Sequence, residues 1–302
     1  MNEPKPHISV CICTYKRPDY LKRLLQDLAR QKTDELFTFS IVVADNDKAQ
    51  SAGPVVAEFA ASSSVRIVYC VQPEQNIALT RNKAVDNAVG DFLATIDDDE
   101  FPIEAWLLNL FRTCLACGVD GVLGPVKPLF EQQPPAWIIK GKFYDRPTHA
   151  TGFIIGWKEG RTGNLLFKRS ILQGVREPFC PAFGSGSEDT EFFNRMIGKG
   201  FRFAWCDEAE VYEIVPPERW KRNFMFRRAL MRGRNSLKYS TGRISDVARS
   251  LIAVPLYTLA LPVLLLMGHH LFIKYLVKLL DHSGRLLALL RLDPMGEKYV
   301  TK

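Results

Sequence analysis

The chain has 302 residues, of which 47% are hydrophobic and 24% are charged. This length allows one large α/β domain or a domain with an appendage, and the composition excludes a disordered chain. The formal net charge of +7 is local, because residues 219–249 contain ten Lys or Arg and a single acid, Asp246. A basic segment beside an apolar one indicates an anionic membrane surface or a phosphate-bearing substrate rather than nucleic acid.

The first hundred residues alternate between near-continuous apolar runs and helical patterns. Pro18 stands near the start of the first helix, whose leucines recur at helical spacing. Strands are predicted at residues 7–14, 39–47, 65–72 and 91–96, and helices after residue 18, at 54–61 and at 76–89. This alternation predicts a mostly parallel sheet with helices on both faces.

Polar clusters follow three of these strands, at the point where each strand ends. Residues 14–17 follow the first strand, residues 45–47 end the second, and residues 97–100 follow the fourth. Ligands bind at the carboxyl ends of the strands in such sheets. We therefore expect the three clusters to meet in one crevice.

Residues 103–215 contain shorter elements. We predict a helix at 103–117 and then a strand at 120–130 that leads into a Pro-rich loop. A strand and a turn are expected within 151–168, and residues 179–201 should form a small-residue loop followed by a helix. Two short strands are predicted at 201–215. The chain shows no internal repeat.

Seven cysteines form no convincing metal or disulfide pattern. Cys11 and Cys13 lie two apart on a predicted strand, and Cys114 and Cys117 form a lone CxxC without a second pair. We interpret both pairs as structural, with zinc or redox chemistry as the alternative for the CxxC. The odd number of cysteines and the lack of a signal peptide predict a reducing, cytoplasmic compartment.

The C-terminal part differs in kind. Residues 251–273 contain no charged side chain, and about 20 apolar residues suffice to span a bilayer core. Residues 271–292 read as a basic amphipathic helix. A single crossing would carry the basic tail to the far side, which the positive-inside rule disfavours. We therefore predict a re-entrant or in-plane helical pair; a buried helix that closes the domain or forms a dimer interface is the alternative.

The acids at residues 97–100 suggest a metal and a nucleotide. Asp97 and Asp99 point the same way on an extended chain, with their Cα atoms about 6–7 Å apart. Mg²⁺ and Mn²⁺ are commonly held by one or two carboxylates together with phosphate oxygens of a substrate. A DxD pattern is weak alone, because acids are frequent in loops.

Five segments together are far more specific. They are VCICTYKRPDYLKRLL (10–25), IVVADND (41–47), NIALTRNKAV (76–85), FLATIDDDEFP (92–102) and GSEDTEFFNRM (186–196). In order and spacing, over about 200 residues, the chain resembles family 2 glycosyltransferases, which are inverting enzymes of the GT-A fold. Within that family it is similar to bacterial exopolysaccharide glucosyltransferases of the succinoglycan type.

The resemblance implies roles for individual residues at the nucleotide sugar. The residues that it places there are Thr14, Tyr15, Arg17, Asp45, Asn76, Arg81, Asn82, Asp97 and Asp98. Asp45 corresponds to the acid that hydrogen-bonds uracil, and Asp97 to the acid near the ribose or the donor sugar. Asp98 occupies a variable position, and an exposed loop acid is the alternative for it, as for Glu100.

The resemblance also implies a metal ligand and a base. Asp99 corresponds to the ligand of Mg²⁺ or Mn²⁺, and Glu213 stands where many relatives have a histidine near the metal, which leaves a further ligand or a surface acid as its two interpretations. Asp189 corresponds to the catalytic base, with Glu188 as a supporting or acceptor-site acid. Inversion itself needs a carboxylate that takes the proton of the attacking hydroxyl. Helix capping is the alternative role of Ser187 and Glu188.

The chain also departs from the processive members of the family. It has no clear QxxRW motif, since Arg219-Trp220 matches only the end, and it lacks the several long apolar segments of a polymer channel. We therefore expect transfer of a single sugar. Arg227, Arg228 and Arg232 have two candidate roles, contact with a diphosphate and contact with anionic lipid.

Two other classes are alternatives. A nucleotidyltransferase has a similar sheet but usually a Gly-rich loop after the first strand, where this chain has TYKRPDY. A non-catalytic, membrane-anchored glycan-binding protein would have no need of Asp97, Asp99 and Asp189. No GxGxxG follows the first strand, which disfavours a dehydrogenase, and nucleic acid is not an expected partner.

The sequence as a whole predicts a GT-A domain at 1–218 and a membrane-associating region at 219–302. The nucleotide-sugar half covers about 1–102 and the acceptor half about 103–218. The predicted reaction moves one sugar, a hexose such as glucose, from a UDP-sugar to a polyprenyl-diphosphate-linked saccharide. We expect it at the cytoplasmic side of a bacterial inner membrane, in surface or exopolysaccharide synthesis.

Overall fold

The structure, a computed structural model, describes residues 4–237 and 243–292. Its contacts divide the chain into two compact units. The first unit comprises residues 1–127 and 146–213, and the second comprises residues 128–145 and 214–302. The division at residue 218 concerns function and stays a prediction.

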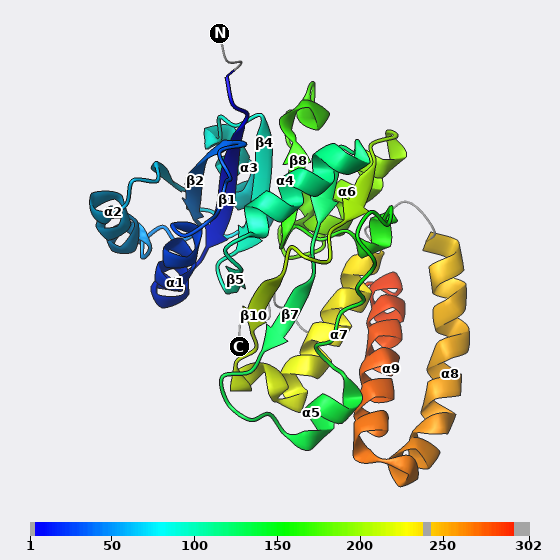
Figure 1. Ribbon diagram of the computed structural model, residues 1–302. Helices are drawn as coiled ribbons and strands as arrows, with labels where there is room; N and C mark the ends of the chain where they lie inside the picture. Colours follow the sequence, from blue (N-terminus) through cyan, green and yellow to red (C-terminus); the bar gives the residue numbers. More distant parts are fainter. Residues whose placement is uncertain (1–3, 238–242, 293–302) are drawn as a thin grey trace. The chain divides into compact units, whose positions relative to one another are not determined.

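The first unit is built on a seven-stranded sheet of order β3-β2-β1-β4-β8-β6-β9 (Figure 1). The strands are β1 (His7–Thr14), β2 (Thr38–Asp45), β3 (Ile67–Val71), β4 (Phe92–Asp97), β6 (Gly121–Leu123), β8 (Leu165–Lys168) and β9 (Phe203–Trp205). The first four are parallel, β6 and β9 are parallel, and only β8 runs antiparallel to its neighbours β4 and β6. The predicted mostly parallel sheet is confirmed.

A second, three-stranded sheet has the order β5-β10-β7. Its strands are β5 (Glu100–Pro102), β7 (Val126–Leu129) and β10 (Val211–Ile214). The single strand predicted at 120–130 is wrong, because the chain leaves the main sheet at Gly124-Pro125 and continues as β7 in this second sheet. Proline cannot donate a ladder hydrogen bond, which accounts for the interruption.

Helices cover both faces of the main sheet. They are α1 (Pro18–Leu28), α2 (Gly53–Ser62), α3 (Ile77–Asn87), α4 (Trp106–Cys117) and α6 (Glu188–Gly198), with short 3-10 helices η1 (Trp157–Glu159), η2 (Arg169–Leu172) and η3 (Pro181–Phe183). α3 and α6 share one apolar cluster with the strands, to which Ala84 and Phe192 belong. On the other face α4 packs near the end of α1, where the side-chain oxygen of Gln31 accepts a hydrogen bond from the Leu107 N–H at 3.1 Å.

One buried amide joins the short strands of the first unit. Asn164 precedes β8, and its Oδ1 accepts a hydrogen bond from the Trp106 indole at 2.7 Å. Its Nδ2 donates to the carbonyls of Pro125 at 2.9 Å and Ala209 at 2.7 Å. Asn164 adopts a φ of 56°, in the left-handed region that asparagine tolerates better than most residues. This side chain therefore fixes the loops that precede β7, β8 and β10.

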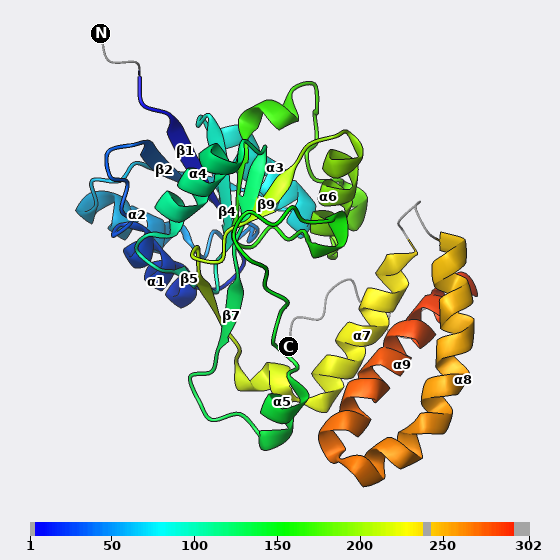
Figure 2. The ribbon, with the colours of Figure 1, turned by 45° about the vertical axis from the view of Figure 1, so that its right-hand side comes forward.

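The second unit is helical within the described residues. It contains α5 (Ala136–Gly141), η4 (Pro217–Trp220), α7 (Arg222–Ser236), α8 (Arg243–Met267) and α9 (His269–Leu289). α9 lies between α7 and α8 (Figure 2). α7 and α9 approach closely at two glycines, since a Cβ on Gly233 would lie 2.0 Å from the Asp281 carbonyl oxygen and one on Gly284 would lie 2.4 Å from that of Leu230.

α8 carries most of the exposed apolar surface of the second unit. Its segment Ile244–Met267 is, by length and composition, the one helix among the described residues that could cross a membrane, with a mean hydropathy of 2.2. Leu259 and Leu266 are 78% and 89% exposed. The helical break between α8 and α9 falls at Gly268, whose φ of 151° suits glycine. Two helices thus cover the predicted apolar and amphipathic segments, and the re-entrant or in-plane arrangement in a membrane stays a prediction.

Replacing Asn164 with alanine should destabilise the first unit. The substitution removes the Asn164 partner of the Trp106 indole N–H and of the Ala209 carbonyl, at about 1 kcal/mol or more each, while the Pro125 carbonyl keeps the Val211 N–H as a donor. We expect the melting temperature of Asn164→Ala to fall by roughly 5 °C or more. Differential scanning fluorimetry measures this, with Asn87→Ala on the exposed face of α3 as the control. A variant as stable as the wild type would contradict the role of Asn164.

Candidate active site

The strand register brings three predicted polar clusters to one edge of the sheet. Thr14 at the end of β1 pairs with Asp45 at the end of β2, and the adjacent Cys13 pairs with Asp97 at the end of β4. The carboxyl ends of these neighbouring parallel strands are therefore level. The pairing of the strand backbones therefore brings the three polar clusters to the edge where the crevice was expected.

Asp45 is fully buried at this edge. Its Oδ2 accepts hydrogen bonds from the Tyr69 hydroxyl and the Ala52 N–H, both at 2.9 Å, and its Oδ1 accepts one from the Asp47 N–H at 2.9 Å. Burial and the bond to Asp45 raise the pKa of Tyr69, so the phenol stays protonated as a donor. Three donors therefore fix the orientation of the Asp45 carboxylate.

Asp98 and Asp99 share one arginine. Arg17 Nη1 donates to Asp98 Oδ1 at 3.0 Å and to Asp99 Oδ2 at 3.1 Å, and the Thr14 hydroxyl donates to Asp98 Oδ2 at 2.8 Å. Burial and the neighbouring Asp99 raise the pKa of Asp98 to about 7, against the opposing effect of Arg17. The alternative that Asp98 is an exposed loop acid is wrong, because Asp98 is buried. Tyr15 follows Thr14 in the chain, and the Lys16 ammonium lies 5.2 Å from the centroid of the Tyr15 ring.

Glu100 is also buried, which the sequence alone did not reveal. Its Oε2 accepts a hydrogen bond from the Asp97 N–H at 3.0 Å. Burial, Asp97 and Glu213 all raise the pKa of Glu100, and Glu213 is its cross-strand neighbour in the β5–β10 pair. A Cβ on Gly163 would lie 2.5 Å from Glu100 Oε1, so a larger residue there would displace this carboxyl group. Glu100 therefore supports the turn that presents Asp97 to Asp99.

Arg81 links the strand end to the helix that carries the predicted base. Its guanidinium donates from Nη2 to Asp97 Oδ1 at 3.0 Å and from Nε to Glu188 Oε1 at 3.1 Å. The side chains of Arg81 and Glu188 are each 7% exposed. Arg81 lies in α3 and Glu188 begins α6, so one buried cation holds β4, α3 and α6 together.

The predicted base lies in the first turn of α6. Asp189 accepts hydrogen bonds at Oδ1 from the Thr190 N–H at 2.7 Å and the Thr190 hydroxyl at 3.2 Å. Burial raises the pKa of Asp189, and burial together with Asp189 raises the pKa of Glu188 to about 7, with Arg81 opposing. Ser187 precedes the helix at a φ of 78° and makes no side-chain cap, although it is the N-cap residue. A carboxylate whose pKa is raised toward neutrality is a better general base.

Asn76 and Asn82 brace the loop before α6. Asn82 exchanges two hydrogen bonds of 2.8 Å with the backbone N–H and C=O of Phe179. Asn76 caps α3 through the Leu79 N–H at 3.1 Å, and its Nδ2 donates to the Pro181 carbonyl at 3.1 Å. Both amides are thus engaged with protein backbone, and their contact with a nucleotide stays a prediction.

The two candidate metal ligands each contact an arginine. Asp99 pairs with Arg17, and Glu213 pairs with Arg146. Within residues 4–237 and 243–292, no group of three or more His, Cys, Asp or Glu side chains has a geometry that holds a metal ion. A metal held mainly by a nucleotide diphosphate needs only one or two protein carboxylates, so these oxygen donors fit Mg²⁺ or Mn²⁺.

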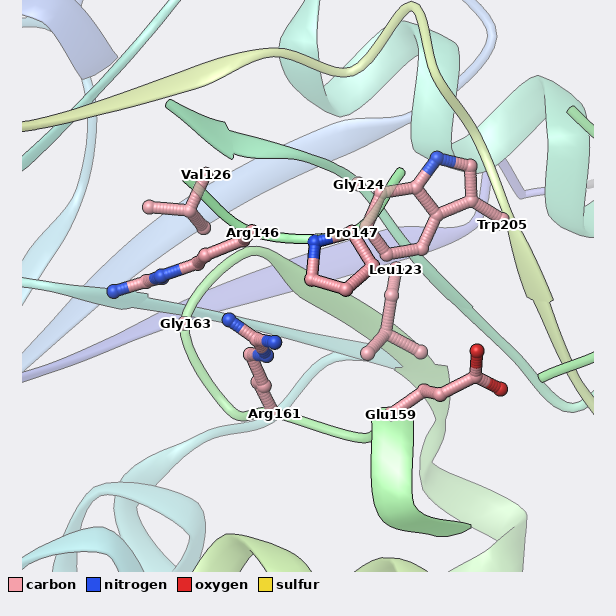
Figure 3. A pocket seen from close by; sticks show the side chains of 9 residues that line it. All are labelled: Leu123, Gly124, Val126, Arg146, Pro147, Glu159, Arg161, Gly163 and Trp205. Carbon is pink, nitrogen blue, oxygen red and sulfur yellow. The ribbon is translucent and has the colours of Figure 1, made fainter. Parts of the chain in front are cut away.

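A small pocket opens beside β6, β8 and β9 in the first unit (Figure 3). Its walls include the apolar side chains of Leu123, Val126, Pro147 and Trp205. Arg146 and Arg161 also line it, and both guanidinium groups lie on the side of the pocket opposite the Glu159 carboxylate. The sequence alone did not predict a role for either arginine. Both were found only because the fold brings them together at an apolar pocket.

The family model described as Glycosyl transferase family 2 matches residues 9–172. The chain belongs to glycosyl transferase family 2. The succinoglycan biosynthesis protein ExoM of Rhizobium meliloti is 36% identical over 234 residues, which cover 76% of this family 2 glycosyltransferase and 74% of ExoM. The predicted family resemblance is therefore confirmed.

Solved structures show the same fold. The mannosyltransferase PcManGT of Pyrobaculum calidifontis, in complex with GDP-Man and Mn²⁺, matches with a TM-score of 0.66 at 16% identity, over 98% of this chain and 89% of that one. S. aureus TarS residues 1–349, in complex with UDP, matches with a TM-score of 0.53 at 16% identity, over 92% and 89% of the two chains. The predicted GT-A class is confirmed.

The ionisation of Glu188 predicts a pH-dependent stability. Because the pKa of Glu188 is raised from 4.5 to about 7 on folding, its contribution to stability is full below pH 4.5 and is lost as the pH rises through about 7. The Glu188→Gln variant cannot titrate, so its melting temperature minus that of the wild type should increase between pH 5 and pH 8. Glu191→Gln, in the same helix, is the control. A difference that stays constant with pH would show that Glu188 ionises normally.

Proposed function

We propose that this glycosyltransferase is inverting and moves one hexose from a UDP-sugar to a lipid-linked saccharide, in bacterial surface or exopolysaccharide synthesis. The observation that supports it most is the Arg81 bridge, which joins the acidic end of β4 to the start of α6 at Glu188, beside Asp189. Two relatives support the substrate classes, since ExoM is a succinoglycan biosynthesis protein and TarS was solved with UDP.

In this proposal Asp189 is the general base. It accepts the proton of the acceptor hydroxyl while that oxygen attacks C1 of the donor sugar, and the bond between C1 and the diphosphate oxygen breaks with inversion. Burial raises the pKa of Asp189, which makes proton transfer to it more favourable. Glu188, held by Arg81, positions the first turn of α6. UDP leaves with the electron pair of the broken bond.

The nucleotide occupies the edge formed by β1, β2 and β4. Asp45 receives the base, and Thr14, Tyr15, Arg17, Asp97 and Asp98 surround the ribose and diphosphate. Asp99, with Glu213 as a further candidate, would hold Mg²⁺ or Mn²⁺. When bound, the metal offsets the negative charge that the leaving diphosphate gains.

The second unit places the enzyme on the cytoplasmic leaflet of the membrane. Its support is the exposed apolar surface of α8, with Leu251, Leu256, Leu259 and Leu266 all more than half exposed. Basic residues of α7 add attraction to anionic lipids. A membrane-bound enzyme of this kind shares the membrane surface with its polyprenyl-diphosphate acceptor.

Substitution of Asp189 tests the base. Asp189→Asn keeps the size and the hydrogen bonds to Thr190 but cannot accept a proton, so sugar transfer should fall by about 10²–10⁴-fold. Affinity for UDP, measured by isothermal titration calorimetry, should stay close to the wild-type value. Glu191→Gln is the matched control. Wild-type turnover in Asp189→Asn would assign the base to another residue.

Metal removal tests the cofactor. EDTA should abolish turnover of the UDP-sugar, and added Mn²⁺ or Mg²⁺ should restore it. Asp99→Asn should raise the metal concentration needed for half-maximal activity by at least about tenfold, because a carboxylate ligand is lost. Asp86→Asn, on the exposed side of α3, should behave as the wild type. Full activity in EDTA would overturn the metal requirement.

Vesicle binding tests the membrane surface. The full chain should sediment with phosphatidylglycerol-containing vesicles, and the double variant Leu259→Asp/Leu266→Asp should bind at least about tenfold more weakly, since two apolar side chains are lost. Leu115→Asp, at a leucine 57% exposed on α4 of the first unit, is the control. Unchanged partition of the double variant would exclude α8 as the binding surface.

A further inference from the structure

Arg161 is a partly buried cation that forms no close ion pair with an acid among the described residues. The side chain lines the pocket of Figure 3, and no hydrogen bond or ion pair of its guanidinium group is found in the described part of the chain. Burial lowers the pKa of Arg161, and the positive charge of Arg146 lowers it further. Taking a guanidinium out of water without a partner costs free energy. A residue of this kind is typical of a site whose anionic partner is a ligand.

Arg146, the second cation of the pocket, has one acidic hydrogen-bond partner. It donates to the Glu213 carboxylate, which is beside Glu100 in the β5–β10 pair. Arg161 itself interacts electrostatically with Asp189, Glu213 and Glu100, in that order of strength. The acids therefore act on Arg161 at a longer range than hydrogen bonds, and the pocket side of its guanidinium group stays available to a ligand.

Strand order separates this pocket from the nucleotide edge. The nucleotide edge is formed by β1, β2 and β4, whereas the pocket walls come from β6, from the loop before β8 and from β9. β8 runs antiparallel to β4, with Leu165 opposite Thr95, so residues 161–164 lie level with the acidic end of β4. The hydroxyl of Thr95 also donates to the Thr162 carbonyl. Arg161 is thus across β4 from Thr14 and Asp45, on the side where an acceptor would approach Asp189.

We propose that Arg161, together with Arg146, binds a carboxylate or phosphate group of the acceptor, next to the hydroxyl that Asp189 deprotonates. The inference rests on the proposed function and adds that the acceptor of the sugar carries an anionic group. Two planar guanidinium groups suit the paired oxygens of either anion. The anion is either the carboxylate of an acidic sugar or the diphosphate that joins the saccharide to its lipid.

Binding of anions to the full chain tests the site. Saturating UDP with Mn²⁺ first fills the nucleotide edge, and isothermal titration calorimetry then uses three probes: methyl β-glucuronoside, methyl β-glucoside and farnesyl diphosphate. We expect at least one of the two anions to bind and Arg161→Gln to weaken that binding at least tenfold. Arg161→Lys should recover part of the affinity. Lys158→Gln, an exposed charge deletion in the same segment, should leave it unchanged.

The outcomes separate the two sources of the anion. Binding of the glucuronoside identifies an acidic sugar, and binding of farnesyl diphosphate alone identifies the lipid diphosphate. Failure of both anions to bind, or equal affinity in Arg161→Gln, overturns the proposal. Weaker UDP affinity in Arg161→Gln also overturns it, because the arginine would then belong to the donor site.

Two further measurements distinguish loss of the anion site from a folding defect, and failure of the anion site from failure of the proposed function. Without ligand, Arg161→Gln should melt at or above the wild-type temperature, since a partly buried charge without a close ion pair is removed; a lower temperature would show a structural partner and contradict the proposal. If the wild type turns over no UDP-sugar yet binds an anion through Arg161, the proposed function fails while the anion site stands.

Discussion

The buried guanidinium of Arg81 is the interaction on which the rest of the site depends. Asp97, Glu188 and Asp189 come from distant parts of the chain, and their like charges oppose assembly in a low-dielectric interior. Arg81 bonds two of the three and lies almost wholly out of water, where charge-assisted bonds are strong. One side chain of α3 therefore positions both the turn after β4 and the first turn of α6. The cost is a set of carboxyl groups with raised pKa values, which is also what a proton-accepting site requires.

Much of this architecture follows from local patterns. Continuous apolar strands interrupted by helical periodicity predicted the parallel half of the sheet, and a parallel sheet necessarily brings Thr14, Asp45 and Asp97 to one edge. The break at Gly124-Pro125 was not predicted, because β6 and β7 together read as one apolar run. Where one sheet ends and another begins depends on which strands are free to pair, and that is a property of the whole fold.

Burial of individual acids could not be predicted in the same way. Asp98 and Glu100 belong to a loop-like acidic run, yet Arg17 comes from the turn after β1 to cover one, and the absence of a side chain at Gly163 makes room for the other. In the helical unit, Arg285 belongs to the segment 271–292 that was predicted as a basic amphipathic helix, whose polar face would contact lipid headgroups or water. It instead donates to Ser236 of α7 at 2.7 Å and to Ser250 of α8 at 2.8 Å, because a polar stripe can face another polar stripe as well as solvent.

The anchoring of the loop before α6 has an evolutionary consequence. Asn76 and Asn82 hold that loop through carbonyl and N–H groups of residues 179 and 181, and these groups are present whatever side chains the loop carries. Mutations at its solvent-facing positions can therefore accumulate without moving Asp189. If Asp189 is the base, as proposed, such a scaffold would let acceptor preference evolve separately from proton transfer, and related enzymes could diversify the glycan they build while keeping the same reaction.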